Sequence, residues 1–390
     1  MPRRVAIVAA APTRTSSHRT DVTYPELVYE AVSAALEQAG LQPGDIDAVA
    51  YGSMDPFDGV FAPERWNVEA CAGAGAAHRP LMKITTGGTT GGSTALAGYY
   101  HVASGMFDAV LAVASQRVGE TLEAQLVLNT AVDPVYERWS GVGAITVAAL
   151  QAARHFWRYG TTEEDLALIS VKNYENARSN PYAHLMRMLT VEDALNTRLV
   201  SWPLRLSDCC PSSDGACAII FASEERARAL SDRPAWVIGA GQITDNYWIG
   251  DRPWYEHWDS LSMLARRVYR QAKIADPLAE LDVAELYNAF SIQEIIEYEA
   301  LGFAEKGKGA ELIRNGVTTM QGQLPVCPSG GVLCTNPIGA SGLIRVAEAA
   351  LQVMGKAEKR QVPGVRKALA HSWGATIGFH TLMVLGSEPP

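Results

Sequence analysis

The same order of strand-like and helix-like segments occurs twice along this chain of 390 residues. Each half opens with an apolar run, residues 4–11 and 235–242, and continues with an amphipathic helix-like segment. A further apolar run, a glycine-rich turn leading into a small-residue helix, and a closing strand follow in both halves, and residues 376–386 add one more strand-like run. Because apolar runs alternate with amphipathic helices, the pattern predicts an α/β fold with buried sheets. Its repetition predicts two similar domains, residues 1–230 and 231–390.

Residues 119–203 have no counterpart in the second half, so we interpret them as an insertion. They mix aromatic residues with short helical patterns. Such a segment is expected to cover a site or a dimer surface, and to set which substrate is accepted.

The composition excludes several classes of protein. With 48% hydrophobic and 19% charged residues, the chain is not expected to be disordered. A net charge of −9 argues against nucleic acid or anionic membrane as a partner, and no apolar run reaches a membrane-spanning length. The N-terminus is too short and strand-like for a signal peptide. The six cysteines show neither metal-ligand spacing nor a secreted disulfide pattern, so we expect no metal and a cytoplasmic location.

The first glycine-rich turn, TTGGTTGG at residues 85–92, contains no Cys, His or acidic residue. It lacks the Lys of a phosphate-binding P-loop, and its glycine spacing and its position differ from those of a dinucleotide-binding fingerprint. Two interpretations remain. Either the glycines let a buried helix approach a strand closely, or the free N–H groups at the helix start hold an oxyanion or a thioester carbonyl.

Several motifs, in the same order, resemble those of the thiolase superfamily. Besides the first glycine turn they are ELYNAFSIQE at 285–294, SGGVLCTNPIGASG at 329–342 and LAHSWGATIGFH at 369–380. The run LSDCCPSSDGACAII at 206–220 is typical of the sterol-carrier-type branch. The resemblance covers nearly the whole chain. It implies two βαβαβαββ halves in a layered αβαβα arrangement with an inserted loop region.

This chain departs from thiolases at the positions that carry their chemistry. In thiolases a Cys at the start of the buried helix takes up the acyl group, and by motif order Gly88 stands in its place. Asn336 stands where a His activates that Cys, and Ser372 replaces the second Cys. Tyr287 and Asn288 replace an Asn or His followed by an acid. A mechanism through an acyl-cysteine is therefore not expected.

The remaining cysteines are candidates for a displaced nucleophile. Cys334 lies on the approach to the second glycine turn rather than at a helix start, and Cys71 and Cys217 fit small buried hydrophobic residues. Cys209 and Cys210 precede a buried strand-like run. We expect a structural role for all five.

Steroid side-chain aldolases resemble thiolases without the nucleophilic Cys, and they carry a Tyr-containing motif at the place of Tyr287. The resemblance implies retro-aldol cleavage of a β-hydroxyacyl-CoA, in which a base removes the β-hydroxyl proton and hydrogen-bond donors hold the enolate. Those aldolases have a second Tyr on the CTNPIG loop. Here no Tyr occurs between Ser329 and Trp373, and Tyr247 is the candidate replacement. A buried Tyr287 bonded to the backbone is the alternative interpretation.

The resemblance assigns catalytic roles to Tyr287, Asn336 and Ser372. A loop-capping Asn and a buried small polar residue are the alternatives for the last two. The site for the substrate and its CoA group is expected to include a set of turn and loop residues, namely Gly88, Tyr247, Asn288, Gly339 and Gly374.

Three functions fit these residues. The first is a carbon–carbon lyase of lipid metabolism that acts on a β-hydroxyacyl-CoA with a steroid-like or other bulky acyl group. The second is an acyltransferase of the acetyl-CoA acetyltransferase type that works with an OB-fold/zinc-ribbon partner, and the third is a non-catalytic subunit paired with an active paralogue. The resemblance also implies a homodimer and no cofactor beyond the coenzyme A of the substrate. Because the sequence shows no basic CoA-binding cluster, we expect CoA binding to be shared with that partner.

Overall fold

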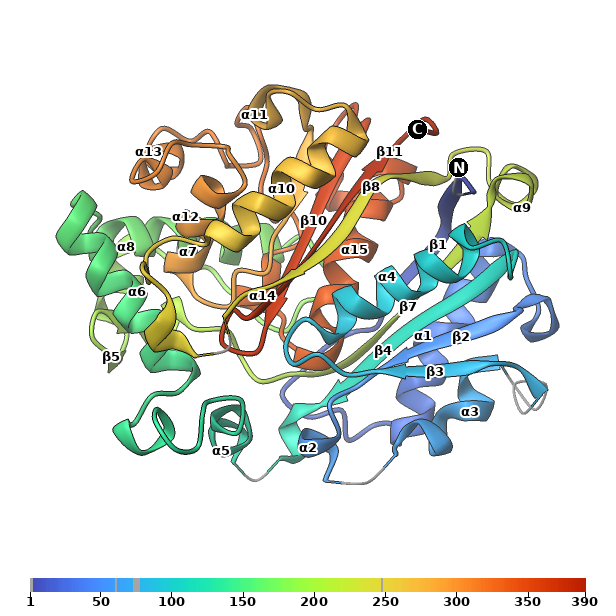
Figure 1. The fold of residues 1–390 in the computed structure, drawn as a ribbon, viewed down its shortest axis with the longest axis horizontal. Coiled ribbons are helices and arrows are strands. Elements are labelled where there is room, and N and C mark those ends of the chain that lie inside the picture. The colour runs from blue at the N-terminus through green and yellow to red at the C-terminus, as the bar shows by residue number, and fades with distance from the viewer. Residues whose placement is uncertain (1–2, 60–61, 73–77, 122, 247) are drawn as a thin grey trace.

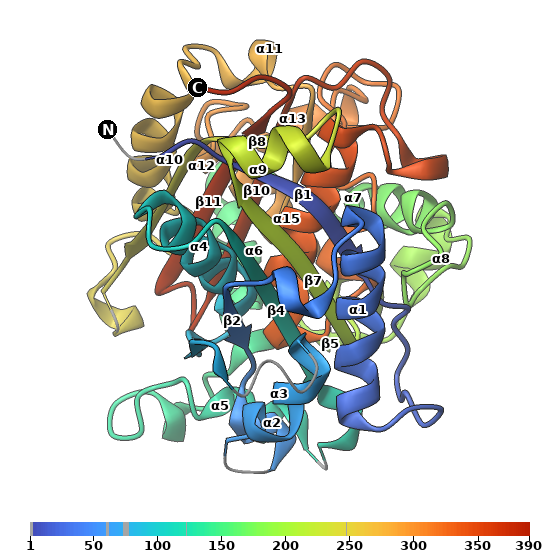
Figure 2. The same cartoon turned by 90° about the vertical axis from the view of Figure 1, so that its right-hand side faces the viewer.

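The computed structural model describes residues 3–59, 62–72, 78–121, 123–246 and 248–390. Figure 1 shows the arrangement of these residues, and Figure 2 shows it from the side.

The two halves of the chain join into one mixed sheet, which has nine strands in the described residues, in the order β3-β2-β4-β7-β1-β8-β11-β10-β9. The two halves meet where β1 pairs antiparallel with β8, with Ala6 opposite Trp236. Outward from this junction, β7, β4 and β2 follow on one side and β11, β10 and β9 on the other. This mirrored order confirms the predicted pseudo-duplicated α/β fold. The strands are β1 (Val5–Pro12), β2 (Ala48–Gly52), β3 (Leu81–Ile84), β4 (Ala109–Arg117), β7 (Asp214–Ser223), β8 (Ala235–Thr244), β9 (Val283–Glu285), β10 (Lys367–Gly374) and β11 (Phe379–Gly386).

Helices cover both outer faces of the sheet and fill the space between its two halves (Figures 1 and 2). Helix α1 (Tyr24–Ala39) packs on the N-terminal strands, and α10 (Asp259–Ala272) with α12 (Ser291–Ala300) packs on the C-terminal strands. Helices α4 (Thr90–Ala103) and α15 (Ile338–Met354) lie between the two halves in a core that both share. The outer helices, the two groups of strands and the central helices thus form five layers, as the αβαβα prediction requires. The central core lies on both sides of the middle helix layer.

Local sequence signals explain where these helices begin and end. Thr23 precedes α1, and its N–H donates to the Glu26 carboxylate at 2.7 Å in a capping box. Gly40 ends the helix with a φ of 66°, in the left-handed region that favours glycine. At α4, glycines replace side chains where the helix meets α15. A Cβ atom built on Gly91 would lie only 2.3 Å from the Leu343 backbone nitrogen.

The inserted residues 119–203 form helices rather than an extended loop. Helix α7 packs against α12 of the C-terminal half, and Lys172 of α7 pairs with Glu294 of α12. The insertion contains α5 (Ala124–Asn129), α6 (Ala144–Tyr159), α7 (Glu163–Ala177), α8 (Val191–Asn196) and a hairpin of β5 (Leu199–Ser201) and β6 (Leu204–Arg205). The remaining helices are α2 (Asp55–Asp58), α3 (Glu64–Ala72), α9 (Glu224–Leu230), α11 (Pro277–Glu280), α13 (Gly309–Arg314) and α14 (Gly331–Cys334).

In the part of the chain that the structure describes, no helix combines the length and the apolar character needed to cross a membrane.

Candidate active site

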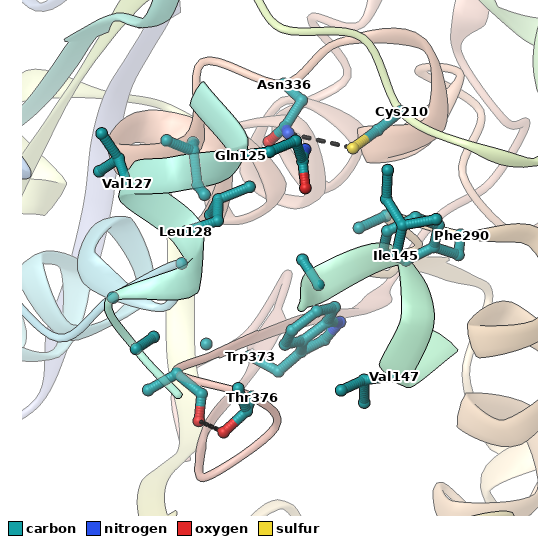
Figure 3. Close-up of a pocket in the computed structure, with 18 of the residues that line it drawn as sticks. Gln125, Val127, Leu128, Ile145, Val147, Cys210, Phe290, Asn336, Trp373 and Thr376 are labelled. Atoms are coloured by element: carbon teal, nitrogen blue, oxygen red, sulfur yellow. Dashed lines mark hydrogen bonds between the residues drawn. The ribbon is translucent and has the colours of Figure 1, made fainter. Parts of the chain in front are cut away.

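A cavity of about 200 Å³ lies where four loops of the two halves meet the insertion. The loops are the first glycine turn before α4, the β9–α12 loop, the second glycine turn before α15 and the β10–β11 turn. The insertion contributes α5 and the first turn of α6. Figure 3 shows Asn336 and Cys210 close together in the cavity wall, with Trp373 and Thr376 in another part of it and Ile145 on the α6 side.

Gly88 and Tyr287, which are far apart in sequence, meet in this cavity. Gly88 comes directly before Thr89, the N-cap of α4, which is the helix position expected for a nucleophile. A Cβ atom built on Gly88 would lie 3.2 Å from the Tyr287 hydroxyl oxygen and 3.0 Å from the Trp373 carbonyl oxygen. The phenol therefore occupies the space into which a side chain at residue 88 would project.

Tyr287 is held firmly by its neighbours. It lies in the short loop between β9 and α12, and its backbone carbonyl accepts a 2.7 Å hydrogen bond from the Trp373 indole nitrogen. The two rings pack edge to face with centroids 5.4 Å apart. Only 2% of the residue is exposed, and this burial raises the pKa of the phenol well above its usual range, an effect that the Ser341 hydroxyl opposes only in part. Tyr287 is therefore a neutral proton-carrying group at ordinary pH.

Asn336 is oriented by two side-chain hydrogen bonds. Its Nδ2 donates to the Cys210 Sγ at 3.1 Å, and its Oδ1 accepts from the Ser341 hydroxyl at 2.8 Å. These bonds fix which end of the amide faces the thiol. Asn336 is half-buried and lines the cavity as predicted by motif order.

The glycines of the first turn divide into two pairs with different surroundings. Gly87 and Gly88 line the cavity. Gly87 has a φ of 63°, and a Cβ there would lie 2.9 Å from the Ala375 nitrogen, so only glycine suits this position. Gly91 and Gly92 instead pack α4 against α15, β10 and β11. Close packing and an open cavity wall are therefore both present in one turn.

Other predicted residues lie elsewhere. Ser372 faces α4, with its Oγ 3.4 Å from the Thr89 Oγ1, and it is absent from the described residues that line the cavity. Asn288 is fully buried, where its amide donates to Glu294 and accepts from the Val332 backbone N–H.

Among the glycines, Gly339 packs on the side chain of Gln116, whereas Gly374 lines the cavity beside Gly88. Tyr247 lies outside the described residues.

Cys209 and Cys210 were expected to be structural, yet both line the cavity. They lie in a loop that ends before β7 begins at Asp214, so the buried strand does not enclose them. Burial raises the pKa of the Cys210 thiol to about 12, which keeps it protonated. Cys217 and Cys334 are fully buried in apolar surroundings, whereas the side chain of Cys71 lies outside the described part of the structure.

Sequence reasoning also missed Trp373 and the turn that follows it. Ala375, Thr376 and Ile377 line the cavity with φ values of 50°, 54° and 67°. Left-handed conformations in three consecutive non-glycine residues are rarely found outside functional sites. The aromatic residue between Ser372 and Gly374 was the only sequence signal for this wall.

The described lining of the cavity is uncharged. It consists mainly of apolar side chains, with Gln, Asn, Ser, Thr, Cys and Tyr as the polar residues, and it contains no Lys, Arg, His, Asp or Glu. Across the described residues, no cluster of three or more His, Cys, Asp or Glu side chains is arranged to hold a metal ion.

Comparison with known proteins agrees with this fold. Residues 5–191 match the thiolase N-terminal domain, and residues 241–387 match the family described as thiolase C-terminal domain-like. An acetyl-CoA acetyltransferase of Methanothermobacter thermautotrophicus is 35% identical over 96% of this chain and 97% of its own. Sterol carrier protein 2 of Gallus gallus is 29% identical over 96% of this chain and 70% of its own. A solved structure titled Ltp2-ChsH2(DUF35) aldolase superposes with a TM-score of 0.85 at 26% identity, covering 99% of this chain and 98% of that one.

The chain belongs to the thiolase superfamily. Within it, the chain falls in the sterol-carrier-protein-2 type branch, and it is an enzyme of the acyltransferase or lyase kind.

Proposed function

We propose that this protein is a carbon–carbon lyase that cleaves a β-hydroxyacyl-CoA by retro-aldol chemistry, without an acyl-cysteine intermediate. One observation carries the proposal. The Tyr287 hydroxyl lies 3.2 Å from the place where the Cβ of a nucleophile at residue 88 would be. Where thiolases carry the cysteine that forms a thioester, this chain thus has a glycine with a proton-exchanging phenol beside it.

The chemistry requires two proton movements and no covalent intermediate. The β-hydroxyl loses its proton as the new carbonyl forms, and the electrons of the broken carbon–carbon bond become the enolate of the shorter thioester. A proton then reaches the α-carbon. A neutral phenol serves here because its oxygen accepts the β-hydroxyl proton as its own proton moves on. The N–H groups of the first glycine turn and the Asn336 amide are the proposed donors to the enolate oxygen.

The acyl group is proposed to be bulky, apolar and uncharged. Val127, Leu128, Ile145, Phe290 and Trp373 surround the cavity (Figure 3), and a charged acyl chain would meet no counter-charge in its described wall. A steroid-like side chain and a place in lipid degradation fit this lining. Coenzyme A as part of the substrate is the only cofactor that we propose.

The assembly is proposed to be a cytoplasmic homodimer core that binds an OB-fold/zinc-ribbon partner. Two features support this. Strand β3 forms a free edge of the sheet, which suits pairing with a second copy. The structural neighbour's title joins two named components, Ltp2 and ChsH2(DUF35), in one aldolase. Size-exclusion chromatography with light scattering, and co-purification from the native source, test both parts.

An acyltransferase is the second candidate, because the acetyl-CoA acetyltransferase relative is 35% identical over nearly the full length. It would need another nucleophile, and Cys210 is the thiol that lies beside Asn336. The raised pKa of Cys210 opposes this role, since the thiolate is the attacking species.

The test is direct. The purified protein is incubated with a panel of β-hydroxyacyl-CoAs carrying bulky apolar chains, and the carbonyl product and shorter acyl-CoA are measured by mass spectrometry. We expect both products in equal amounts and an unmodified intact protein mass. A stable acyl adduct on a cysteine would favour the acyltransferase. No turnover with or without the co-purified partner would favour the non-catalytic subunit.

A further inference from the structure

The thiol of Cys210 is held at the cavity wall by the same loop that carries Tyr287. The Cys210 backbone N–H donates to the Ala289 carbonyl at 2.9 Å, and the backbones of Cys209 and Phe290 pair in an isolated antiparallel β-bridge. Cys210 is therefore tied to the chain two residues beyond Tyr287. Both side chains line one cavity. The two groups are close enough that a charge on the thiol would raise the pKa of the phenol.

The hydrogen bonds around Cys210 leave its thiol hydrogen free. The Asn336 Nδ2 donates to the sulfur, as Figure 3 shows, so a lone pair of Sγ is occupied from that side. The Asn336 Oδ1 is used by the Ser341 hydroxyl, which prevents the amide from turning around. In the described residues, the structure shows no acceptor for the S–H group. A neutral thiol with its sulfur anchored is arranged to donate a proton toward the cavity.

Retro-aldol cleavage needs a proton at the α-carbon as well as an acceptor at the β-oxygen. We propose that Cys210 is a catalytic residue of this site and donates its thiol proton to the α-carbon of the thioester enolate. This inference rests on the proposed function and adds a second group beside Tyr287. It also places a catalytic thiol on a loop that precedes β7, distant in sequence from both cysteine positions of thiolases.

The proton count closes in this scheme. As the carbon–carbon bond breaks, the β-hydroxyl proton passes to the Tyr287 oxygen and the phenol's own proton passes to solvent water. The Cys210 S–H bond then breaks as the α-carbon C–H bond forms, and the thiolate that is left takes a proton back from solvent water. Substrate protons and electrons are conserved, both side chains return to their starting state, and no oxidant, reductant or metal is consumed.

The uncharged lining of the cavity favours proton donation by Cys210 over nucleophilic attack. A cysteine nucleophile needs a neighbouring base or cation that generates the thiolate, and the described lining contains no His, Lys, Arg, Asp or Glu. Proton donation instead requires the protonated thiol, which burial favours.

Deuterium exchange into propionyl-CoA tests the proposal without depending on the unknown acyl group. By microscopic reversibility, the small fraction of Cys210 present as thiolate removes an α-proton from propionyl-CoA, and the thiol exchanges that proton with D₂O before returning a deuteron. The wild-type protein in D₂O should therefore place deuterium at the α-carbon, as measured by mass spectrometry. Cys210→Ala should slow this exchange at least about 100-fold, the usual contribution of a general acid or base. Cys210→Ser, which keeps the shape of the side chain, should slow it at least about tenfold because a hydroxyl is the weaker acid. Cys217→Ala is the matched control, since Cys217 lies in the core of β7 away from the cavity, and its exchange rate should stay within about twofold of wild type.

Three results would overturn the inference: no exchange by the wild-type protein, equal exchange by the wild type and both Cys210 variants, or an acyl adduct on Cys210. Its failure can be told apart from failure of the proposed function. Exchange that depends on Cys210 without any β-hydroxyacyl-CoA cleavage leaves the thiol's role intact and removes the lyase. Cleavage that survives in Cys210→Ala and Cys210→Ser supports the lyase and removes the catalytic role of the thiol.

Discussion

The two halves of this protein repeat one strand order but fill their cores with different chemistry. The core between α1 and the N-terminal strands consists of apolar residues, many of them alanines, together with Tyr24, Tyr51 and Trp236. The C-terminal half instead contains buried charge. Among the described residues, the Lys or Arg ion pairs with both side chains at most 5% exposed all include a residue beyond position 284, and they are Glu285–Arg345, Glu348–Arg360 and Lys172–Glu294.

This difference follows the division of work at the cavity. The first half contributes Gly88, a position without a side chain, and Cys210 from the loop before β7, whereas the second half contributes Tyr287, Asn336 and Trp373. Buried ion pairs add little net stability but are costly to break, so they hold a loop in one arrangement. Glu285 lies two residues before Tyr287, and its pair with Arg345 of α15 ties the β9–α12 loop to the helix that follows Asn336. The charged core thus positions the groups that face the cavity.

Breaking that pair should produce the largest effect on stability. Arg345→Met leaves Glu285 buried without its partner, and the free energy of unfolding should fall by about 3–5 kcal/mol. Urea unfolding followed by circular dichroism measures the loss. The control is Arg4→Met, which removes a surface pair with Glu224 and should change stability by less than about 1 kcal/mol. Equal effects of the two variants would show that the buried pair has no special importance.

Removing one oxygen atom tests the chemistry of the second half. Tyr287→Phe should reduce turnover about a thousandfold, equivalent to about 4 kcal/mol in the barrier, with little change in melting temperature. The matched control is Tyr269→Phe in α10, whose hydroxyl donates to the Leu301 carbonyl away from the cavity. That variant should lose some stability and keep its turnover. If Tyr287→Phe turns over at the wild-type rate, the chemistry belongs to another group.

The close helix packing at the centre provides the third comparison. Gly91→Ala would place a methyl carbon 2.3 Å from the Leu343 backbone nitrogen, and overpacking of this kind costs about 1–3 kcal/mol. Thermal unfolding should show the loss. Gly44→Ala, at a position with open space around it, should leave the melting temperature within about one degree of wild type. A stable Gly91→Ala protein would mean that α4 and α15 can separate easily.

A methyl group at the cavity should act on turnover rather than on folding. Gly88→Ala brings a carbon to 3.2 Å from the Tyr287 hydroxyl, so we expect about a tenfold loss of kcat, equivalent to about 1.4 kcal/mol. Steady-state kinetics and a melting curve on the same sample separate the two effects. Loss of folding with unchanged specific activity would place Gly88 with the packing glycines.

The smallest expected effect concerns Asp58, an acid of the first half with a strongly raised pKa. Burial raises the pKa of Asp58 from 3.8 to about 7, so folding favours its protonated form. That contribution is present below about pH 4 and is lost as the pH rises through 7. Asp58→Asn should therefore match wild type near pH 4 and be more stable by about 1 kcal/mol at pH 8, after allowance for solvent screening. Melting temperatures across this range test the sign, and a constant difference between variants would contradict it.

The sequence predicted the repeated fold well because strand and helix periodicity depends on local burial. It also identified Gly88 and Tyr287 as the informative departures. The contact between these two residues depends on how α4 and the β9–α12 loop approach each other. Local sequence patterns do not predict that approach. Ser372 and Trp373 show a second limit. Motif order selects Ser372, but neighbouring residues of β10 point to opposite faces, and it is Trp373 that faces the cavity.

Cys210 shows why site prediction from one chain stops short. Its segment was expected to be structural because it leads into a buried strand-like run, and β7 does follow it from Asp214. The loop before the strand packs against the β9–α12 loop, where the Cys210 N–H donates to the Ala289 carbonyl, and this contact between distant segments places the thiol at the cavity wall.

The contact between Gly88 and Tyr287 also constrains the history of this chain. A single reversion of Gly88 to Cys would put the new side chain against the Tyr287 hydroxyl and the Trp373 carbonyl, in space that is already filled. A descendant could regain an acyl-accepting cysteine only if the tyrosine changed first or at the same time. The order of substitutions therefore matters, and each half of the pair protects the other from drift.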